Sequence, residues 1–265
     1  MPELTAVAHA LADAAGEAIL PLFRTGGLMT EDKSGDGPAE FDPVTLADRS
    51  AEEAMRSVLA ERRPDDAILG EEFGRQSGST GLTWILDPID GTRGFVAGTP
   101  NWGVLIAVAA EDGPLLGLIA QPYIGERFFG AGGFAEFSRG KTRLPMKTRS
   151  TRSLADCILF TTFPEVGTEA EGRAFRALAP KTKLVRYGMD CYAYALLAAG
   201  QIDLVVEAGL EAYDIMAPVA VIEAAGGVVT DWSGAPAHNG GRALAASSAA
   251  VHAAALEVLQ GSMGR

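Results

Sequence analysis

The sequence is poor in cysteine and histidine, with two cysteines and three histidines among 265 residues. Cys157 and Cys191 stand far apart and lack the paired spacing of a thiolate zinc site. We therefore expect neither a disulfide framework nor a structural zinc ion. No motif surrounds His9, His238 or His252, so we expect structural or surface roles for them and assign no histidine nucleophile.

Positive charge is also scarce, because 22 Lys and Arg stand against 34 Asp and Glu. Surfaces that bind nucleic acid need clustered Lys and Arg, and the sequence has no such cluster. An apolar run of about 20 residues, the length that spans a bilayer, is absent as well. The chain does not begin with a basic leader followed by an unbroken apolar stretch. These absences predict a cytoplasmic protein that binds neither nucleic acid nor a membrane.

Apolar residues make up 48% of the chain, which is enough for a sizeable core. Their helical spacing predicts two helices, from Leu4 to Leu22 and from Ala47 to Leu59. The polar, glycine-bearing segment 26–43 is predicted to be a mobile loop. Short β-rich runs over 67–129 predict an antiparallel sheet, and residues 130–140 predict a glycine-rich loop or a bulged hairpin tip.

After residue 154 the predicted strands and helices alternate, which is typical of an α/β lobe. The strands are expected near 157–161, 183–186, 204–207 and 228–230. The helices are expected near 169–178, 190–199, 215–225 and 249–259. We therefore divide the chain into an α+β lobe over 1–145 and an α/β lobe over 146–265.

Carboxylates follow two of the strands predicted for the first lobe. Glu71 and Glu72 come directly after residues 67–70. Asp87 and Asp90 come after the apolar run 84–86, in the string Asp-Pro-Ile-Asp-Gly. The proline and the glycine favour a sharp turn that brings both aspartates to one point at the end of a strand. Carboxylates so close repel one another unless a cation lies between them.

Oxygen ligands select Mg²⁺, Mn²⁺ or Ca²⁺ rather than zinc. A pair of Mg²⁺ ions can hold both the attacking and the leaving oxygen of a phosphoryl displacement. The backbone N–H groups of Gly91 and Thr92 follow directly and could hold a phosphate. A solvated turn remains an alternative for the string from Asp87 to Gly91 taken alone, and Glu71 and Glu72 could be exposed charges.

Four strings in fixed order decide between these alternatives: Gly70-Glu71-Glu72, Trp84 to Thr92, Tyr213 to Pro218, and Glu223 to Gly227. Together they resemble the inositol monophosphatase family of metal-dependent phosphatases, over roughly Asp42 to Asp231. The resemblance implies an α/β fold, a layered α-β-α-β-α sandwich with a metal site between the two lobes. It also implies a small phosphate monoester as substrate, inhibition by Li⁺ and a homodimer.

The resemblance places the ligands of two or three Mg²⁺ ions, or of Mn²⁺, on five residues. These are Glu71, Asp87, Ile89 through its backbone carbonyl, Asp90 and Asp214. Asp214 would then close from the second lobe a site that begins in the first. It could instead cap a helix beginning at the next residue, and the two roles can coexist.

The catalytic residues that the resemblance implies are Asp48, Thr92 and Glu72. Asp48 would pair with the Thr92 hydroxyl and act as general base on the attacking water, and Glu72 would support the neighbouring ligand. Asp48 could instead cap the second helix. Family members often carry a lysine upstream of this helix, and the role of the nearby Lys33 stays open.

Substrate contacts are implied for Arg186, Gly188, Met189, Asp190 and Glu207. The string from Arg186 to Tyr192, together with Gly91 to Gly98 and Trp102, is similar to the bacterial histidinol-phosphate phosphatase branch. Histidinol phosphate carries an ammonium and an imidazole, which Asp190 and Glu207 could recognise. The alternatives are that Asp190 caps a helix and that Arg186 pairs with Glu207 or with a neighbouring subunit.

This similarity predicts the hydrolysis of L-histidinol phosphate to L-histidinol and phosphate, a step of histidine biosynthesis. Inositol 1-phosphate, a sugar phosphate or a 3′-phosphorylated nucleotide are the alternative substrates. The alternative outside enzymes is a catalytically silent phosphate-binding regulator, which the complete set of carboxylates disfavours.

Overall fold

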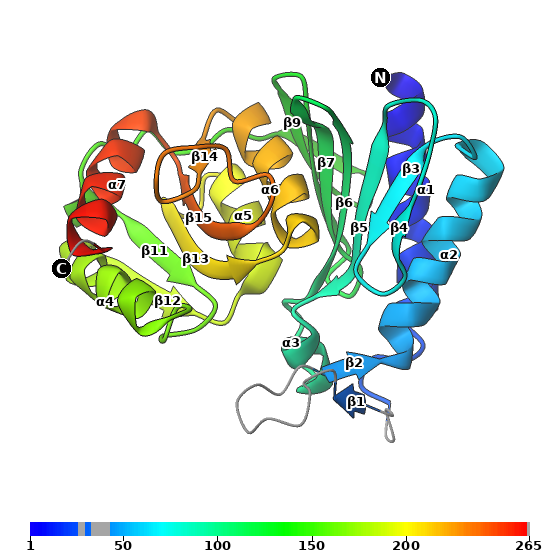
Figure 1. Cartoon of the computed structure of the whole chain (residues 1–265), viewed down its shortest axis with the longest axis horizontal. Coiled ribbons are helices and arrows are strands. Elements are labelled where there is room, and N and C mark those ends of the chain that lie inside the picture. Colours follow the sequence, from blue (N-terminus) through cyan, green and yellow to red (C-terminus); the bar gives the residue numbers. More distant parts are fainter. Residues whose placement is uncertain (26–29, 33–42, 264–265) are drawn as a thin grey trace.

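The computed structural model describes residues 1–25, 30–32 and 43–263 (Figure 1). Most of the segment 26–43, including Lys33, lies outside the described residues. The described residues in and next to this segment form β1 (Thr30–Asp32) and β2 (Pro43–Thr45), which pair antiparallel. A small sheet is therefore present where the sequence predicts only a loop, because the backbone groups of each strand find partners in the other.

The first lobe is built on an eight-stranded sheet with the order β10-β9-β8-β7-β6-β5-β3-β4. Helices α1 (Pro2–Ile19) and α2 (Leu46–Arg62) pack together on one face of this sheet (Figure 1). The short helix α3 (Thr92–Val96) follows β5. The strands are β3 (Ala67–Gly70), β4 (Gly74–Gln76), β5 (Thr83–Asp90), β6 (Gly103–Ala110), β7 (Gly113–Gln121), β8 (Glu126–Ala131), β9 (Phe134–Arg139) and β10 (Thr142–Pro145).

The second lobe holds a five-stranded sheet with the order β12-β11-β13-β15-β14. Its strands are β11 (Ile158–Thr161), β12 (Leu184–Tyr187), β13 (Leu204–Leu210), β14 (Val228–Thr230) and β15 (Gly241–Ala246). Its helices are α4 (Glu169–Leu178), α5 (Asp190–Ala198), α6 (Ala212–Ala224) and α7 (Ala249–Met263), with 3₁₀ turns at Leu154–Asp156 and Ala179–Lys181. Because α5 and α6 lie between the two sheets and α4 and α7 cover the outer face, the layered α/β sandwich is confirmed (Figure 1).

Further features of the two sheets differ from the elements expected from the sequence. β15 is missed because its alanine-rich sequence favours helix, yet β13 and β14 pair with it on both sides and make it a strand. Residues 130–140 form neither a loop nor a bulged hairpin tip, because most of them belong to β9, which pairs with β8 in unbroken register and with β10 on its other side. β3 pairs with β5 in parallel, although the whole sheet is expected to be antiparallel.

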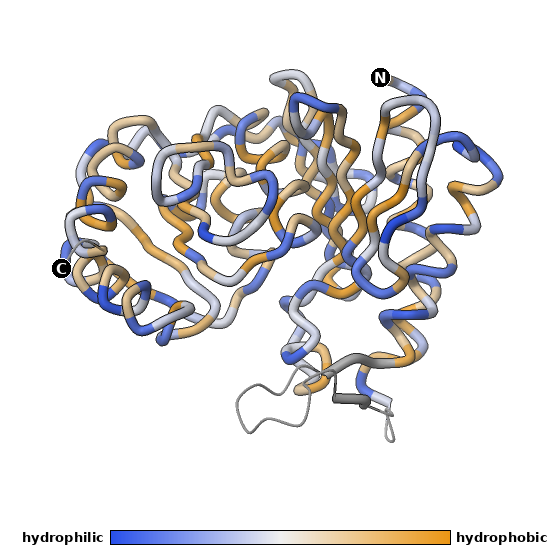
Figure 2. The backbone as a smooth tube through the Cα atoms, viewed as in Figure 1, coloured by the Kyte–Doolittle hydropathy of each residue, from blue (hydrophilic) through white to orange (hydrophobic). Residues whose placement is uncertain are grey.

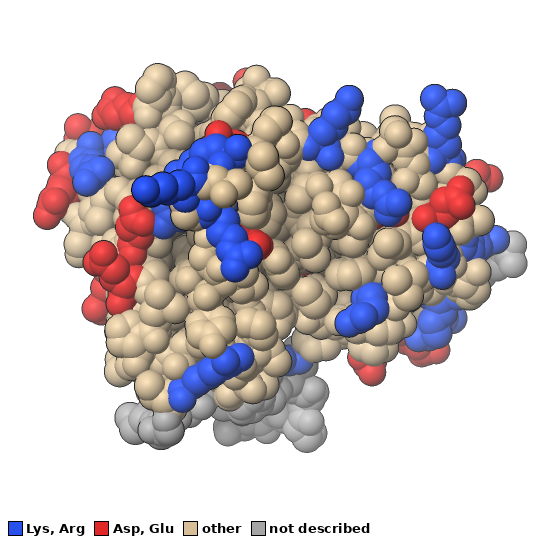
Figure 3. All heavy atoms as spheres, turned by 180° about the vertical axis from the view of Figure 1, so that it is seen from behind, with Lys and Arg blue, Asp and Glu red and all other residues tan. Residues whose placement is uncertain are grey.

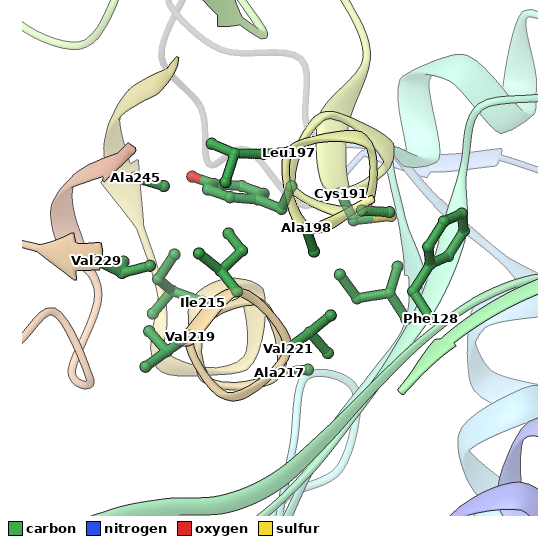
Figure 4. Close-up of a cluster of buried hydrophobic side chains, with 14 of the residues drawn as sticks. Phe128, Cys191, Leu197, Ala198, Ile215, Ala217, Val219, Val221, Val229 and Ala245 are labelled. Atoms are coloured by element: carbon green, nitrogen blue, oxygen red, sulfur yellow. The ribbon is translucent and has the colours of Figure 1, made fainter. Parts of the chain in front are cut away.

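Apolar side chains fill both faces of the eight-stranded sheet. Figure 4 shows the core between the two sheets, to which α5 contributes Cys191 and Leu197, α6 contributes Ile215 and β8 contributes Phe128. On the other face, a second cluster around Trp84 and Trp102 packs against α1 and α2. Figure 2 shows the same distribution, with hydrophobic residues concentrated along the strands. The ends of β3 and β5 are therefore rigid positions on which to build a site.

Charged side chains lie in short groups on the far face of the molecule (Figure 3). Arg127 of β8 pairs with Asp13 of α1, and Arg143 Nε of β10 lies 3.5 Å from the carboxylate of Glu136 on β9. The surface over these strands therefore carries both positively and negatively charged side chains. Within the described ranges, no helix has the length and apolar character needed to cross a membrane.

Candidate metal centre and active site

The ends of β3 and β5 lie side by side because these two strands pair in parallel. Gly70 stands opposite Leu86, and the Glu71 N–H donates to the Leu86 carbonyl at 3.1 Å. The residue that follows each member of this pair carries a carboxylate: Glu71 comes directly after β3, and Asp87 is the next residue of β5. Parallel pairing thus brings together two of the predicted ligands that come from separate strings of the sequence.

A bulge in β5 directs Asp90 toward the same point. From Asp87 to Asp90, β5 advances by three residues while its partner β6 advances by two, so β5 contains one extra residue. Pro88 has no N–H to give to the ladder, which accounts for the irregularity. Pairing nevertheless continues to Asp90, whereas the sequence predicts a strand that ends at Leu86.

The turn after β5 depends on a glycine. Gly91 is the N-cap of α3 with a φ of 86°, a left-handed conformation that suits glycine. The Thr92 hydroxyl donates to the Ile89 carbonyl at 3.0 Å. A methyl group on Gly91 would also press on Asp190, at 3.1 Å from its carboxylate carbon. The turn therefore places the Ile89 carbonyl and the Thr92 hydroxyl together and leaves room for a side chain from the second lobe.

Asp214 reaches the cluster from the second lobe. It lies inside the first turn of α6, which begins earlier than the helix start predicted at Ile215. Its Oδ2 accepts the Glu211 N–H at 2.7 Å and completes a capping box. One carboxylate oxygen from each of Asp87, Asp90 and Asp214 lies within 4.8 Å of the others. Capping and membership of the acidic cluster therefore coexist.

Burial and mutual repulsion raise the pKa of Asp87 and of Asp90 well above the usual value. For Asp87, burial is the largest cause, followed by the neighbouring carboxylates, foremost Glu71. For Asp90, burial again comes first, followed by the charge of Asp190. Asp87 Oδ1 is buried and has no hydrogen-bond partner among the described residues. A divalent cation would satisfy this oxygen and offset the repulsion, and the all-oxygen donor set fits Mg²⁺ or Mn²⁺.

We expect Mg²⁺ to raise the melting temperature of the protein by more at pH 8 than at pH 5.5. An acid whose pKa is raised on folding contributes stability that is present below its unfolded pKa of about 4 and is lost as pH rises through the folded pKa. The metal-free protein therefore loses the contribution of Asp87 and Asp90 as pH rises, whereas a bound cation offsets their repulsion.

The measurement is the difference in Tm between Mg²⁺ and EDTA at each pH. This difference cancels the effect of the three histidines, whose pKa values burial lowers. A difference that stays constant or shrinks as pH rises would contradict a cation site on these carboxylates.

Two of the predicted catalytic residues are buried beside this region. Asp48 lies in the first turn of α2 and is 1% exposed. The side chain of Glu72 is 2% exposed and lies 3.6 Å from Arg49 Nε, so it is not an exposed charge. β2 contacts both α2 and α3, so the helix that carries Asp48 and the helix that begins at Thr92 share a neighbour (Figure 1).

Glu52 is a positioning residue that the sequence motifs do not indicate. Its carboxylate is fully buried and accepts the N–H groups of Glu72 at 2.7 Å and of Phe73 at 3.2 Å. Arg56 Nε lies 2.8 Å from the same carboxylate. Glu52 therefore holds the loop that follows β3. The available signal was a glutamate on the apolar face of α2, one turn after Asp48.

Asp190 enters the site at the start of α5. Its φ is 46°, a left-handed conformation that is uncommon outside glycine. The N-cap of α5 is Met189, and Asp190 Oδ2 accepts a hydrogen bond from Asn101 Nδ2 at 3.2 Å, so the helix-cap alternative does not describe this carboxylate. The next N–H, of Cys191, donates to Asp90 Oδ2 at 2.5 Å and ties this turn to the acidic cluster.

Glu207 is a second buried carboxylate, and the charge of Asp190 acts on it. Its Oε1 accepts the N–H and the hydroxyl of Thr162 at 2.7 and 2.9 Å, and its Oε2 accepts the Thr161 hydroxyl at 3.3 Å. Burial raises the pKa of Glu207 to about 8, with the Thr162 hydrogen bonds opposing and Asp190 adding to the shift. Burial also raises the pKa of Asp190 to about 6, against the opposing charge of Arg93. The surroundings of these carboxylates favour a cation.

The other predicted substrate contacts are placed less centrally. Arg186 is exposed on β12 and forms no hydrogen bond or ion pair with a described residue, so pairing with Glu207 is not seen. Gly188 occupies the turn before α5 with a φ of 73°. Met189 is partly buried against the core between the sheets. The structure thus brings Asp190 and Glu207 to the site and leaves Arg186 at the surface.

The sequence matches a known family and several of its members. Residues 1–263 match the sequence model of the inositol monophosphatase family. The chain is 44% identical over 237 residues to the chloroplastic bifunctional phosphatase IMPL2 of Arabidopsis thaliana, and the match covers 88% of this chain and 66% of that protein. It is 36% identical to the histidinol-phosphatase of Streptomyces coelicolor, with 93% of this chain and 92% of that protein covered.

Solved structures show the same fold. An inositol monophosphatase from Zymomonas mobilis aligns with a TM-score of 0.82 at 36% identity and covers 96% of both chains. An inositol monophosphatase from Thermotoga maritima aligns with a TM-score of 0.82 at 25% identity, covering 100% of this chain and 99% of the other. The names of the relatives thus include both histidinol-phosphatase and inositol monophosphatase.

Proposed function

Because the chain belongs to the inositol monophosphatase family, we propose that it is a Mg²⁺-dependent phosphatase whose substrate is L-histidinol phosphate. The substrate proposal rests on two carboxylates in surroundings that favour a cation: Asp190, whose turn is tied to Asp90 of the acidic cluster, and Glu207, on which the charge of Asp190 acts. Histidinol phosphate supplies such a cation in its ammonium and imidazole, whereas a polyol phosphate does not. Relatives named histidinol-phosphatase, which are 34 to 36% identical to this chain, support the same substrate.

We assign two or three Mg²⁺ ions, or Mn²⁺, to the converging oxygens at the ends of β3 and β5. The proposed ligands are Glu71, Asp87, the Ile89 carbonyl, Asp90 and Asp214. When bound, Mg²⁺ would lower the pKa of the attacking water and stabilise the charge that develops on the phosphate. A carbonyl oxygen has two lone pairs, so Ile89 can serve as ligand and still accept the Thr92 hydroxyl.

The residues of the chain then have separate roles. Since the Thr92 hydroxyl donates to Ile89, its oxygen remains free to accept a hydrogen bond from the attacking water and hold it in line. Asp48, buried in the neighbouring helix, takes the proton as general base. The N–H groups of Gly91 and Thr92 bind the phosphate, and Glu72 supports the loop that carries the first ligand.

The experiment that tests this function is phosphate release by the purified protein from four substrates. These are L-histidinol phosphate, inositol 1-phosphate, fructose 1,6-bisphosphate and adenosine 3′,5′-bisphosphate, each with Mg²⁺ and with added Li⁺. We expect the highest kcat/KM with histidinol phosphate. A preference for inositol 1-phosphate would overturn the substrate proposal and leave the metal site standing, and no release from any of them would favour a silent regulator.

Replacing Asp190 by asparagine should weaken the binding of the cationic substrate selectively. Asparagine keeps the shape and tolerates the left-handed backbone, but it removes the charge. A hydrogen bond to a charged group contributes about 1.5–3 kcal/mol, so KM for histidinol phosphate should rise roughly 10- to 100-fold. Turnover of glycerol 2-phosphate, which has an uncharged organic part, should change little.

The matched control is Asp156→Asn, which removes an exposed carboxylate from the 3₁₀ turn before β11. It should leave both substrates unaffected. An equal loss on both substrates in the Asp190→Asn variant would refute cation recognition by this residue.

A further inference from the structure

Asn101 connects the two lobes at the proposed substrate site. It lies in the loop between α3 and β6, immediately before the buried Trp102 of the first-lobe core. Its Nδ2 donates to the Gly188 carbonyl at 2.8 Å and to Asp190 Oδ2 at 3.2 Å, both on the turn that leads into α5. A side chain of the first lobe therefore holds the turn of the second lobe that carries Asp190.

The side-chain amide of Asn101 supplies the two hydrogen-bond donors that this turn requires. Its nitrogen carries two N–H groups, and the two acceptors use both of them. An aspartate at position 101 would bring no donor and would face the like charge of Asp190. The amide also packs near Gly94 of α3, where an added methyl group would lie 3.8 Å from both the oxygen and the nitrogen of Asn101.

Asp190 needs such a partner because its backbone has an unfavourable, left-handed conformation. A residue other than glycine persists at a φ of 46° only where its surroundings hold it. Its Oδ2 faces the first lobe, where it accepts from Asn101 and lies 3.2 Å from the position of a methyl group added to Gly91. Its Oδ1 forms no hydrogen bond with any residue of the described part of the chain. One oxygen is thus held and the other is available.

We propose that Asn101 is a specificity-determining positioning residue, which orients Asp190 so that its second carboxylate oxygen faces the cationic group of the substrate. The proposal rests on the function proposed above. The phosphate end of the substrate lies at β5 and α3, and the loop of Asn101 continues directly from α3. Asn101 therefore sets the distance between the phosphate end and the carboxylate that binds the cationic end. Arg93, whose guanidinium carbon lies 4.9 Å from the centroid of the Phe163 ring, is a second contact between the lobes, and its charge acts on Asp190.

The test uses the full chain with Mg²⁺ and compares L-histidinol phosphate with glycerol 2-phosphate. Asn101→Ala should raise KM for histidinol phosphate roughly 5- to 10-fold, the effect of one or two lost hydrogen bonds, with kcat changed by less than about twofold. Kinetics with glycerol 2-phosphate should not change. Asn101→Asp should raise KM for histidinol phosphate further. The control is Thr99→Ala, which removes a hydrogen bond to the Gly94 carbonyl within the same loop.

A second variant separates positioning from folding. In the Asp190→Asn background, Asn101→Ala should add little to KM, because both changes act on one interaction. Fully additive effects, or equal losses on both substrates, would overturn the role of Asn101. If the wild-type protein discriminates between the substrates and Asn101→Ala discriminates equally, only this inference falls. If the wild-type protein does not discriminate, the proposed substrate falls and the inference falls with it.

Discussion

Asp214→Asn should lower Mg²⁺-dependent phosphate release by on the order of 100- to 1,000-fold, the size of effect seen when one electrostatic stabiliser of a transition state is removed. The asparagine oxygen can still accept the Glu211 N–H, so α6 keeps its cap. What is lost is a negative charge that faces Asp87 and Asp90. That charge contributes to the raised pKa of both aspartates, so the metal-free variant should melt at a higher temperature than the wild type at pH 7–8.

The opposite direction of the two effects makes this prediction specific. A variant that is merely misfolded would lose activity and stability together, whereas a variant that lacks a repelling ligand loses activity and gains metal-free stability. Tm in EDTA and phosphate release with Mg²⁺ are the two measurements. Asp112→Asn, in the exposed turn between β6 and β7, is the control and should change neither. Unchanged activity in Asp214→Asn would remove this residue from the site.

Glu52→Gln should lower the free energy of unfolding by about 2–4 kcal/mol, because a buried ion pair and two hydrogen bonds are disrupted. A glutamine has one acceptor oxygen where the carboxylate has two. It therefore cannot accept from Glu72 and Phe73 and also offset the charge of Arg56. The loop that carries Glu71 should loosen, and the Mg²⁺ concentration for half-maximal activity should rise roughly 10- to 100-fold.

The control for this prediction is Glu53→Gln, the next residue of α2, whose side chain is exposed. It should leave both the unfolding free energy and the Mg²⁺ dependence unchanged. Gly70→Ala should reproduce the Glu52→Gln effects, since a methyl group at this position would overlap the Glu52 carboxylate. If Glu52→Gln weakened stability but left the Mg²⁺ dependence at the wild-type value, Glu52 would be a residue of the core rather than of the site.

Most elements of the fold could be predicted from local patterns. The spacing of apolar residues located α1 and α2 within a few residues, because amphipathic periodicity is a property of a short segment, and the helices expected after residue 154, α4 to α7, also lie close to their predicted positions. β15 could not be found in this way, since its sequence favours helix and its pairing partners lie elsewhere in the chain. The parallel pairing of β3 and β5 was missed for the same reason, although it sets Glu71 beside Asp87.

The candidate site, like the fold, could be predicted from the sequence only in part. Carboxylates after apolar strands, and a turn of proline and glycine, are local signals that are compatible with a hard-cation site. The resemblance of four strings in fixed order to the inositol monophosphatase family then predicted the metal site and the phosphate chemistry. The convergence of Asp214 with Asp87 and Asp90, and the burial of Glu52 under the loop after β3, depend on how helices and sheets pack. The hold of Asn101 on Asp190 joins residues of different lobes. Such contacts are made only when distant segments meet, because no short segment encodes the direction in which its side chain will find a partner.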